Sequence, residues 1–259
     1  MFQPVLPAGG LVGWRFLERT LETQQAAFAS GEAIQRDLAH FREAIGGVLT
    51  AEALVADRRL RSVALSAFGL EADVDATYFV RRILEEGTTE PSALANRLAD
   101  RRYREMSRAF GFGGPGAPNT VLPGFADRIA ERFVAQGFEA AVGDRDETLR
   151  LALDARRSLP RIAAGGASDD TAWFTVMGTP PLRRVLEGAL GLPESFGALD
   201  LDRQLEEFRS AADRRFGVDA IADFAAEPTL SRMIDLFLLR AGAEAQAVTS
   251  PALVLLRGF

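Results

Sequence analysis

The chain has 259 residues, of which 47% are hydrophobic and 25% are charged, so it can bury a core and does not have the composition of a disordered protein. It contains no cysteine and no lysine, which excludes disulfides, thiolate nucleophiles, cysteine-ligated metal centres, Schiff-base lysines and the lysine-dependent phosphate loop. Its formal net charge is −6, whereas nucleic-acid binding usually needs a basic balance.

Nothing in the sequence predicts a membrane span or an export signal. A membrane-spanning helix would need a run of about 18 or more apolar residues, and the chain has none. The residues before Arg15 are apolar but uncharged, and they are interrupted by Pro4, Pro7 and three glycines, unlike a secretory signal. Six Arg-Arg pairs occur, but none precedes an apolar export segment. We therefore expect a cytoplasmic protein without membrane insertion, which the absence of cysteine also favours.

Apolar residues recur at helical spacing along almost the whole chain, and the period-two alternation of strands is nearly absent. Trp14, Leu17, Leu21 and Phe28 predict a first helix over residues 11–29. The segment Ala252–Leu256 fits either a short strand or a tail packed on the core. In chain order, further amphipathic helices are predicted at 32–45, 73–86, 124–136, 146–162 and 200–215.

Four further segments share one design and indicate an internal repeat. They begin at Asp57, Asp100, Thr179 and Glu227, and each predicts a helix that follows a shorter helix. Their apolar residues fall at i, i+3, i+4, i+7 and i+8, which is one helical face, with serine at i+4 in the second segment. These positions are Leu60, Val63, Ala64, Ala67 and Phe68; Tyr103, Met106, Ser107 and Phe110; Leu182, Val185, Leu186, Ala189 and Leu190; and Leu230, Met233, Ile234, Phe237 and Leu238.

The ends of these four helices are also marked in the sequence. Asp57, Asp100 and Thr179 are residue types that cap a helix N-terminus through a side-chain oxygen. Pro180 and Pro228 suit the first helical position, where no backbone donor is needed. Glycine commonly ends a helix, so the expected C-terminal ends are Gly69, Gly111, Gly191 and Gly242.

The predicted fold is all-α and multihelical, with four helix–turn–helix copies in two halves and little or no strand. A single copy could not bury its apolar face, whereas paired copies could. The predicted boundaries are residues 1–31 for an N-terminal segment and first helix, 32–122 for the first half, 123–242 for the second half and 243–259 for a C-terminal tail.

Four sequence blocks resemble a known bacterial family. They are FQPVLPAGGLVGWRFL, LVADRRLRSVALSAFGLE, LANRLADRRYREMSRAFGFG and MGTPPLRRVLEGALGLP, and they are similar to the Domain of Unknown Function 1217 family over nearly the whole chain. The resemblance implies a multihelical fold. Because some such proteins are found among flagellar genes of alphaproteobacteria, it also implies a role in flagellar assembly or motility. It brings no catalytic residues with it.

The residues that could carry chemistry favour structural roles. His40 is the only histidine, so a two-histidine metal site cannot form within one chain and a serine triad would have to use this residue. Its position in mid-helix beside Phe41 favours a surface or packing role. Gly111, Gly113 and Gly116 match G-x-G-x-x-G, but they follow a helix rather than a strand, which favours a simple connecting loop.

Acidic residues occur in short runs that do not meet the spacing of a calcium-binding EF-hand loop. Helix caps and first-turn charges explain them, and a metal site or a glycosidase-type carboxylate pair is the alternative. The runs are Glu71, Asp73 and Asp75; Asp144, Asp146 and Glu147; Asp169 and Asp170; and Asp200 and Asp202.

Arginine pairs near the starts of three repeated helices are the most distinctive polar feature. A solvated helix face with salt bridges explains them, and the alternative is that their donor forks bind an acidic partner. The apolar ends, residues 1–13 and 243–259, either lie over the core or dock on a second molecule. The candidate partner-binding residues are Arg58, Arg59, Arg101, Arg102, Arg183 and Arg184.

We therefore expect a non-enzymatic helical protein–protein interaction protein, with no catalytic residue, cofactor or metal, and with a protein partner rather than nucleic acid. The resemblance adds a flagellar component as the candidate partner. The alternative is a small-ligand-binding protein or hydrolase with a carboxylate- or arginine-lined pocket between the two halves. A deep polar cleft with converging carboxylates of shifted pKa would favour the alternative, and a shallow, apolar, exposed groove would favour the interaction protein.

Overall fold

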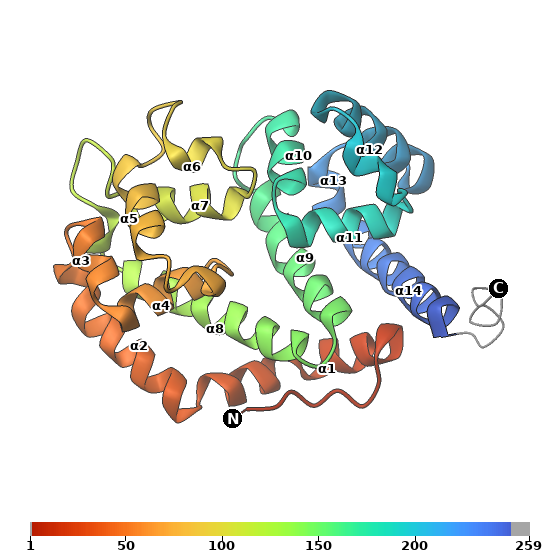
Figure 1. Ribbon diagram of the computed structural model, residues 1–259. Coiled ribbons are helices and arrows are strands. Elements are labelled where there is room, and N and C mark those ends of the chain that lie inside the picture. The colour runs from red at the N-terminus through yellow and green to blue at the C-terminus, as the bar shows by residue number, and fades with distance from the viewer. Residues whose placement is uncertain (1, 250–259) are drawn as a thin grey trace, which may run out of the picture. The chain divides into compact units, whose positions relative to one another are not determined.

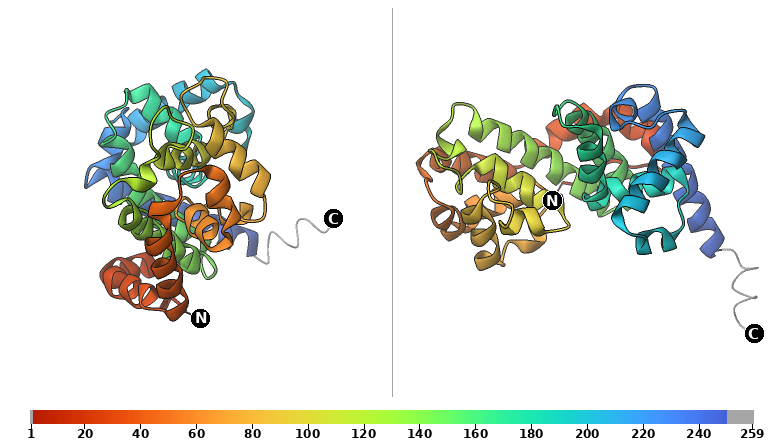
Figure 2. Two further views of the ribbon diagram at one scale, coloured as in Figure 1. Left: turned by 90° about the vertical axis from the view of Figure 1, so that its left-hand side faces the viewer. Right: turned by 90° about the horizontal axis from the view of Figure 1, so that it is seen from above.

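The computed structural model describes residues 2–249. Over these residues it contains fourteen α-helices, a few short 3-10 turns and no strand, so the predicted all-α, multihelical fold is confirmed (Figures 1 and 2). No helix in this part of the chain combines the length and the apolar character needed to cross a membrane.

The chain divides into two compact units. Unit 1 consists of the residues up to Pro4 together with Thr20–Ala141, and unit 2 consists of Val5–Arg19 and the chain from Val142 onward. The divisions fall inside α1 (Gly10–Ala29) and α8 (Phe125–Gly143). The units differ from the halves drawn from the sequence at α8, which the sequence boundary placed in the second half.

Unit 1 is built around the aromatic ring of Phe110. This ring is fully buried, and its centroid lies 5.2 Å from that of Phe125, 5.8 Å from Phe112 and 6.4 Å from Phe68. In the same unit α2 packs against α4, and α5 packs against α3, α6 and α7. The helices are α2 (Glu32–Ala44), α3 (Ala51–Ala56), α4 (Arg58–Ser66), α5 (Thr77–Glu86), α6 (Leu94–Arg97) and α7 (Arg101–Phe110), with 3-10 turns η1 (Ile45–Gly47), η2 (Glu71–Asp73) and η3 (Asn119–Val121).

Unit 2 is built on α9, against which α11, α13 and α14 pack (Figure 1). A second aromatic cluster centres on Trp173, whose ring lies 5.7 Å from Phe208 and 6.1 Å from Phe224. The helices are α9 (Glu147–Ala163), α10 (Asp169–Met177), α11 (Pro180–Leu190), α12 (Leu201–Phe216), α13 (Ile221–Ala225) and α14 (Thr229–Thr249), with the 3-10 turn η4 (Glu194–Ala198).

The four repeated segments are helices with the predicted buried faces. They correspond to α4, α7, α11 and α14, and each contacts the shorter helix that precedes it. Every predicted apolar position on α4, α11 and α14 is buried, while on α7 Tyr103 is only partly buried. The serine of the second segment is buried because Ser107 Oγ donates a hydrogen bond of 2.9 Å to the carbonyl of Ile83.

The packing of the second helix pair differs between the units. The first pairs are alike, because α4 packs on α2 in unit 1 and α11 packs on α9 in unit 2. In unit 2, α13 and α14 also pack on α9, whereas α6 and α7 of unit 1 pack on α5. The helix order is therefore shared and the complete packing is not, so the internal duplication stays a prediction.

The predicted helix ends are found only in part. Thr179 precedes α11, but its hydroxyl donates to the carbonyl of Thr175 and caps no backbone N–H group. Helix α14 begins at Thr229, one residue after Pro228, and α4 ends at Ser66, three residues before Gly69.

The carboxylates of Asp57 and Asp100 accept backbone N–H groups at the starts of α4 and α7. Gly111 and Gly191 end α7 and α11 in the left-handed conformation. Gly242 does not end its helix, because α14 continues to Thr249. Alanines and Glu244 around this glycine are strong helix formers, which explains the continuation.

Two other boundaries need correction. The helix predicted at 124–136 continues to Gly143 as α8, through a glycine at position 137. An ideal Cβ at Gly137 would lie 2.8 Å from Cζ of Phe28, so the ring packs where only glycine leaves room. Residues 243–249 of the predicted tail belong to α14, and the predicted segment Ala252–Leu256 lies outside the described residues. At the other end, Phe2 lies over the core of unit 1, with its ring 5.4 Å from Phe28.

The cap of α4 leads to a stability prediction. Burial raises the pKa of the Asp57 carboxyl, but the N–H groups of Leu60 and Arg59 and the His40 ring outweigh it, so the pKa lies below its usual value. We expect Asp57→Ala to lower the free energy of unfolding by about 1 to 2 kcal/mol. Asp57→Asn keeps a capping oxygen and should lose less.

Urea denaturation of these two variants at several pH values provides the measurement. A carboxyl with a lowered pKa in the folded state stabilises the protein above its unfolded pKa, and this contribution is lost as the pH falls through the folded pKa. The difference between the natural chain and Asp57→Asn should therefore shrink below about pH 4. Equal losses for the two variants at neutral pH would contradict the capping role.

Candidate functional site

The arginines proposed for partner binding differ in how they are engaged. On α4, exposed Arg58 lies 3.6 Å from Asp75, and Nε of Arg59 lies 3.4 Å from Oδ1 of Asp37. These loose, exposed pairs contribute little to stability, so both guanidinium groups are accessible to a partner.

Arg102 and Arg183 hold their own units together. Arg102 binds the carboxylate of Asp100 and donates to the carbonyl of Gly69. Arg183 donates to Glu187 Oε1 at 2.7 Å and to Gln204 Oε1 at 2.8 Å, which links α11 to α12.

The remaining two candidates are unengaged. The side chains of Arg101 on α7 and Arg184 on α11 form no hydrogen bond or ion pair with a described residue. Arg184 is exposed and Arg101 is partly buried. Partner binding through the six predicted arginines stays a prediction, and Arg102 and Arg183 already have structural partners.

The single histidine and the glycine motif have structural surroundings. His40 Nε2 lies 2.7 Å from Oδ2 of Asp57, the residue that caps α4. Gly111 ends α7, and Gly113 packs against the backbone of Gly87 so closely that a Cβ there would overlap it. This motif follows a helix, as the sequence indicated, and it lacks the strand that a dinucleotide site requires.

The acidic runs serve mainly as caps and ion-pair partners. Asp146 and Asp200 accept backbone N–H groups at the starts of α9 and α12. Asp169 and Asp170 lie 2.5 Å and 2.7 Å from Nη2 of Arg209. Among the residues that the structure describes, no three acidic or histidine side chains are grouped as a metal site would need.

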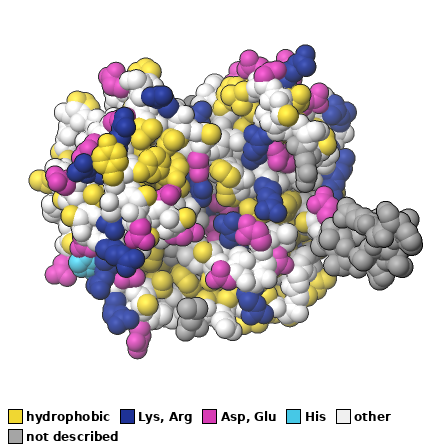
Figure 3. Space-filling model, viewed as in Figure 1, with side chains coloured by type: hydrophobic (Ala, Val, Ile, Leu, Met, Phe, Trp, Pro, Cys, Tyr) yellow, Lys and Arg dark blue, Asp and Glu magenta, His cyan; other side chains and the backbone are white. Residues whose placement is uncertain are grey.

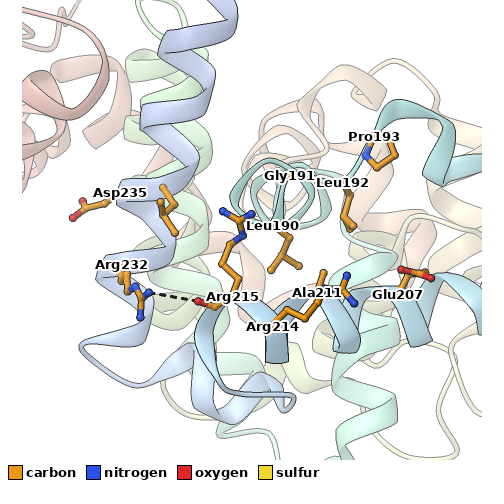
Figure 4. A pocket seen from close by; sticks show the side chains of 11 residues that line it. Leu190, Gly191, Leu192, Pro193, Glu207, Ala211, Arg214, Arg215, Arg232 and Asp235 are labelled. Carbon is orange, nitrogen blue, oxygen red and sulfur yellow. Dashed lines mark hydrogen bonds between the residues drawn. The ribbon is translucent and has the colours of Figure 1, made fainter.

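Unit 2 contains an open groove of about 880 Å³ (Figure 4), which we call the unit 2 groove. Its volume lies within the range of about 300–1,000 Å³ that is common for ligand sites. It is formed by the end of α11 and the following turn, by the second half of α12 and by α14. The lining residues are Leu190, Gly191, Leu192, Pro193, Glu207, Ala211, Arg214, Arg215, Arg232, Asp235 and Leu236.

The end of α11 fixes one wall of the groove. Gly191 ends this helix with φ +72°, and a Cβ at that position would overlap the guanidinium group of Arg240 from α14. With this space free, Nη1 of Arg240 donates to the carbonyls of Gly188 and Ala189 at 3.0 and 3.1 Å. Arg240 therefore adds side-chain donors to the last carbonyl groups of α11, of which that of Gly188 also accepts the backbone N–H of Gly191.

Three arginines line the groove without a carboxylate partner among the described residues, namely Arg214, Arg215 and Arg232, and Arg240 lies beside them against Gly191. Arg215 has no hydrogen bond from its side chain, which extends toward the turn at Gly191 (Figure 4). Arg232 Nη2 lies 3.5 Å from the carbonyl of Arg215, and Arg214 donates to Ser210. Burial lowers the pKa of Arg240, and the positive charge of Arg215 lowers it further, against a smaller opposing effect of Glu244. The cluster is thus held together against its own repulsion.

The two acidic residues of the lining do not neutralise this charge. Asp235 turns away from the groove (Figure 4), and its Oδ2 lies 2.5 Å from Nη2 of Arg15 on α1. Burial raises the pKa of Asp235, an effect that Arg15 opposes. Glu207 is exposed and forms no ion pair with a described residue. The groove therefore joins a cationic side to an apolar wall of Leu190, Leu192, Pro193, Ala211 and Leu236.

The sequence contained one signal for this groove. Arg214 and Arg215 form one of the six Arg-Arg pairs, but they occupy the last turn of α12, where arginines usually interact with the helix dipole. Arg232 and Arg240 are eight residues apart on α14 and so lie on one face, two turns from each other. What no local pattern reveals is that these two helices meet at the end of α11.

Comparison with known proteins identifies a family and a fold. A sequence model of a family described as "Protein of unknown function (DUF1217)" matches residues 67–227, which is more than half of the chain. The crystal structure of protein AGR_C_984 from Agrobacterium tumefaciens has a TM-score of 0.72 and 24% sequence identity, covering 92% of this chain and 97% of that one. At this identity the likeness shows a shared fold. No curated protein matches the chain.

The contact between Gly191 and Arg240 can be tested with a matched pair of glycines. Gly191 and Gly217 both have φ +72°, but only Gly191 has a neighbour where a Cβ would lie. We expect Gly217→Ala to lower the free energy of unfolding by about 1 kcal/mol, the cost of a left-handed alanine. Gly191→Ala should lose more, because the methyl group also displaces Arg240. Urea denaturation measures both, and equal losses would contradict the contact.

Proposed function

Because the chain belongs to the DUF1217 family, whose members are of unknown function, we propose a role from the geometry of its own residues. The protein is a non-enzymatic helical interaction protein, and the unit 2 groove is its contact with a protein partner. The observation that carries this role is that Arg214, Arg215 and Arg232 line one groove without a carboxylate partner among the described residues, with Arg240 beside them at Gly191.

Charge complementarity supports an acidic partner. Like charges held close together raise the electrostatic energy of the free protein, and carboxylates of a partner would relieve it. Arginine suits this role because its planar fork binds a carboxylate through two parallel hydrogen bonds. Arg215 is the most available donor, since its guanidinium group has no hydrogen bond in the described structure.

The apolar wall narrows the type of partner further. Leu190, Leu192 and Pro193 form one side of the groove, and Leu236 of α14 adds to it. A segment with aliphatic residues on one side and acidic residues on the other would cover both parts at once. An amphipathic helix has this distribution and is a common occupant of helical grooves.

The family resemblance supplies the cellular setting of the proposal. Similar proteins are found among flagellar genes of alphaproteobacteria, so the proposed partner is a cytoplasmic component of flagellar assembly or motility. The groove itself supports only the acidic, amphipathic character of the partner.

A small anionic ligand is the second candidate. The groove volume of about 880 Å³ would hold such a molecule, and Arg215 lies near Arg240 at the end of α11. Hydrolysis within the groove has less support, because Asp235 is bound to Arg15 and only Glu207 remains as a carboxylate. A general acid or base needs a carboxyl directed at the substrate.

Affinity capture with matched variants tests the proposal. The groove variant is Arg215→Gln with Arg232→Gln, and the control is Arg145→Gln with Arg203→Gln, two exposed arginines of unit 2 outside the groove and outside the six predicted partner-binding residues. We expect the natural chain and the control to retain one partner from a bacterial lysate, and the groove variant to lose it. Recovery should also fall as salt is raised, because exposed charge pairs are screened.

Three results would contradict the proposal. The first is equal recovery of the partner by the groove variant and the natural chain, and the second is equal loss from the control variant. The third is calorimetric binding of inorganic phosphate that disappears in the groove variant while recovery of the protein partner is unchanged. This last result would favour the small anionic ligand.

A further inference from the structure

A second set of unpaired arginines lies on one face of α7 in unit 1. Arg101, Arg104 and Arg108 are spaced at i, i+3 and i+7, so they share one side of the helix. The buried residues Met106 and Phe110 lie on the opposite side, and Arg104 and Arg108 are exposed. We call these three arginines the α7 arginine face.

These arginines lack the partners that arginines on a neighbouring helix have. On α5, Arg81 and Arg82 each pair with the glutamate four residues later, at 3.6 and 2.6 Å. No side chain of the α7 arginine face forms a hydrogen bond or ion pair with a described residue. Arginines on α5 thus have a glutamate partner on their own helix, whereas the three arginines of the α7 arginine face have none.

The residues at the i+4 positions of α7 explain this difference. Four residues after Arg101 is Glu105, but its carboxylate lies 2.5 Å from Nη2 of Arg132 on α8. Four residues after Arg104 is Arg108, a like charge, and like charges at this spacing destabilise a helix. Arg108 lies in the last turn of α7, where its charge interacts favourably with the helix dipole, but its repulsion from Arg104 opposes this gain, and none of the three arginines has an acidic partner within the described chain.

We propose that the α7 arginine face docks an acidic helix of a protein partner, and that this contact is separate from the unit 2 groove. From Arg101 to Arg108 the helix rises about 10.5 Å. Carboxylates at i, i+3 or i+4, and i+7 on a partner helix repeat at the same intervals, so three arginine–carboxylate pairs form when the two helices lie side by side. Arg102 takes no part, because it binds Asp100 and the carbonyl of Gly69.

A helix fits this face better than nucleic acid does. The affinity of a protein for a duplex grows with the number of phosphates that it neutralises, and this face offers only three guanidinium groups for such contacts. Acidic and basic side chains are also interspersed on the surface that Figure 3 shows, so a long polyanion would meet repulsive charges. A short acidic segment avoids most of them.

Fluorescence anisotropy with a defined probe tests this inference. The probe is a labelled, alanine-based helical peptide with glutamates at i, i+3 and i+7, and its references are the same peptide with glutamines and a short DNA duplex. The test variant is Arg104→Gln with Arg108→Gln. The matched control is Arg81→Gln with Arg82→Gln on α5, where both arginines are already paired.

We expect the natural chain and the α5 control to bind the glutamate peptide, and the α7 variant to bind it about fivefold or more weakly. The thermal midpoint of the α7 variant should change little, because the loss of the repulsion between Arg104 and Arg108 offsets the loss of a positive charge at the end of α7. The groove variant, Arg215→Gln with Arg232→Gln, should bind this peptide as tightly as the natural chain does. A negative result with the peptide would therefore count against the α7 arginine face and leave the proposed role of the unit 2 groove untouched.

Four outcomes would overturn the inference. These are absence of peptide binding by the natural chain, equal affinity for the glutamate and glutamine peptides, unchanged affinity in the α7 variant, and tighter binding of the DNA duplex than of the peptide.

Discussion

Unit 2 depends on the close packing of α11 against α14. An ideal Cβ at Gly188 would lie 2.8 Å from Cδ2 of Phe237, so the two helices approach each other at a distance that only glycine permits. One turn later, Gly191 leaves the space that the Arg240 guanidinium group occupies. Because both contacts use the absence of a side chain, the same approach that buries the apolar faces also places a cation at the end of α11. The wall of the unit 2 groove follows from this packing.

Charge in this molecule is organised locally rather than globally. The net charge is −6, yet every basic side chain apart from His40 is an arginine, and many are directed at a backbone carbonyl or a nearby carboxylate. Arginine remains charged in almost any environment, so where partners are absent the charge cannot be removed by losing a proton. The groove and the α7 arginine face are two places where this condition holds for several neighbouring arginines.

The sequence predicted those features that depend on neighbours along the chain. The spacing of Leu182, Val185 and Leu186 is enough to define a buried helical face, because periodicity is local. It could not show that Gly137 lies inside a helix, since the reason is the ring of Phe28, more than a hundred residues earlier. The groove was missed for the same reason, as it joins residues from α11, α12 and α14. The Arg-Arg pairs in the sequence point only to single helices. The structure distinguishes arginines that form ion pairs within the protein, such as Arg183 with Glu187, from arginines whose side chains have no partner among the described residues.

The bonds between Arg240 and the end of α11 have a consequence for recognition. An arginine side chain that is free in solution carries about 2 kcal/mol of rotamer entropy, which an incoming anion must overcome. Arg240 is already oriented by the carbonyls of Gly188 and Ala189, so it meets a ligand with little freedom left to lose. Arg215 has no such anchor, and the ordering penalty falls mainly on that side chain. In the proposed complex, an acidic segment therefore meets one adaptable guanidinium group on the groove lining, Arg215, and one preorganised group beside it, Arg240.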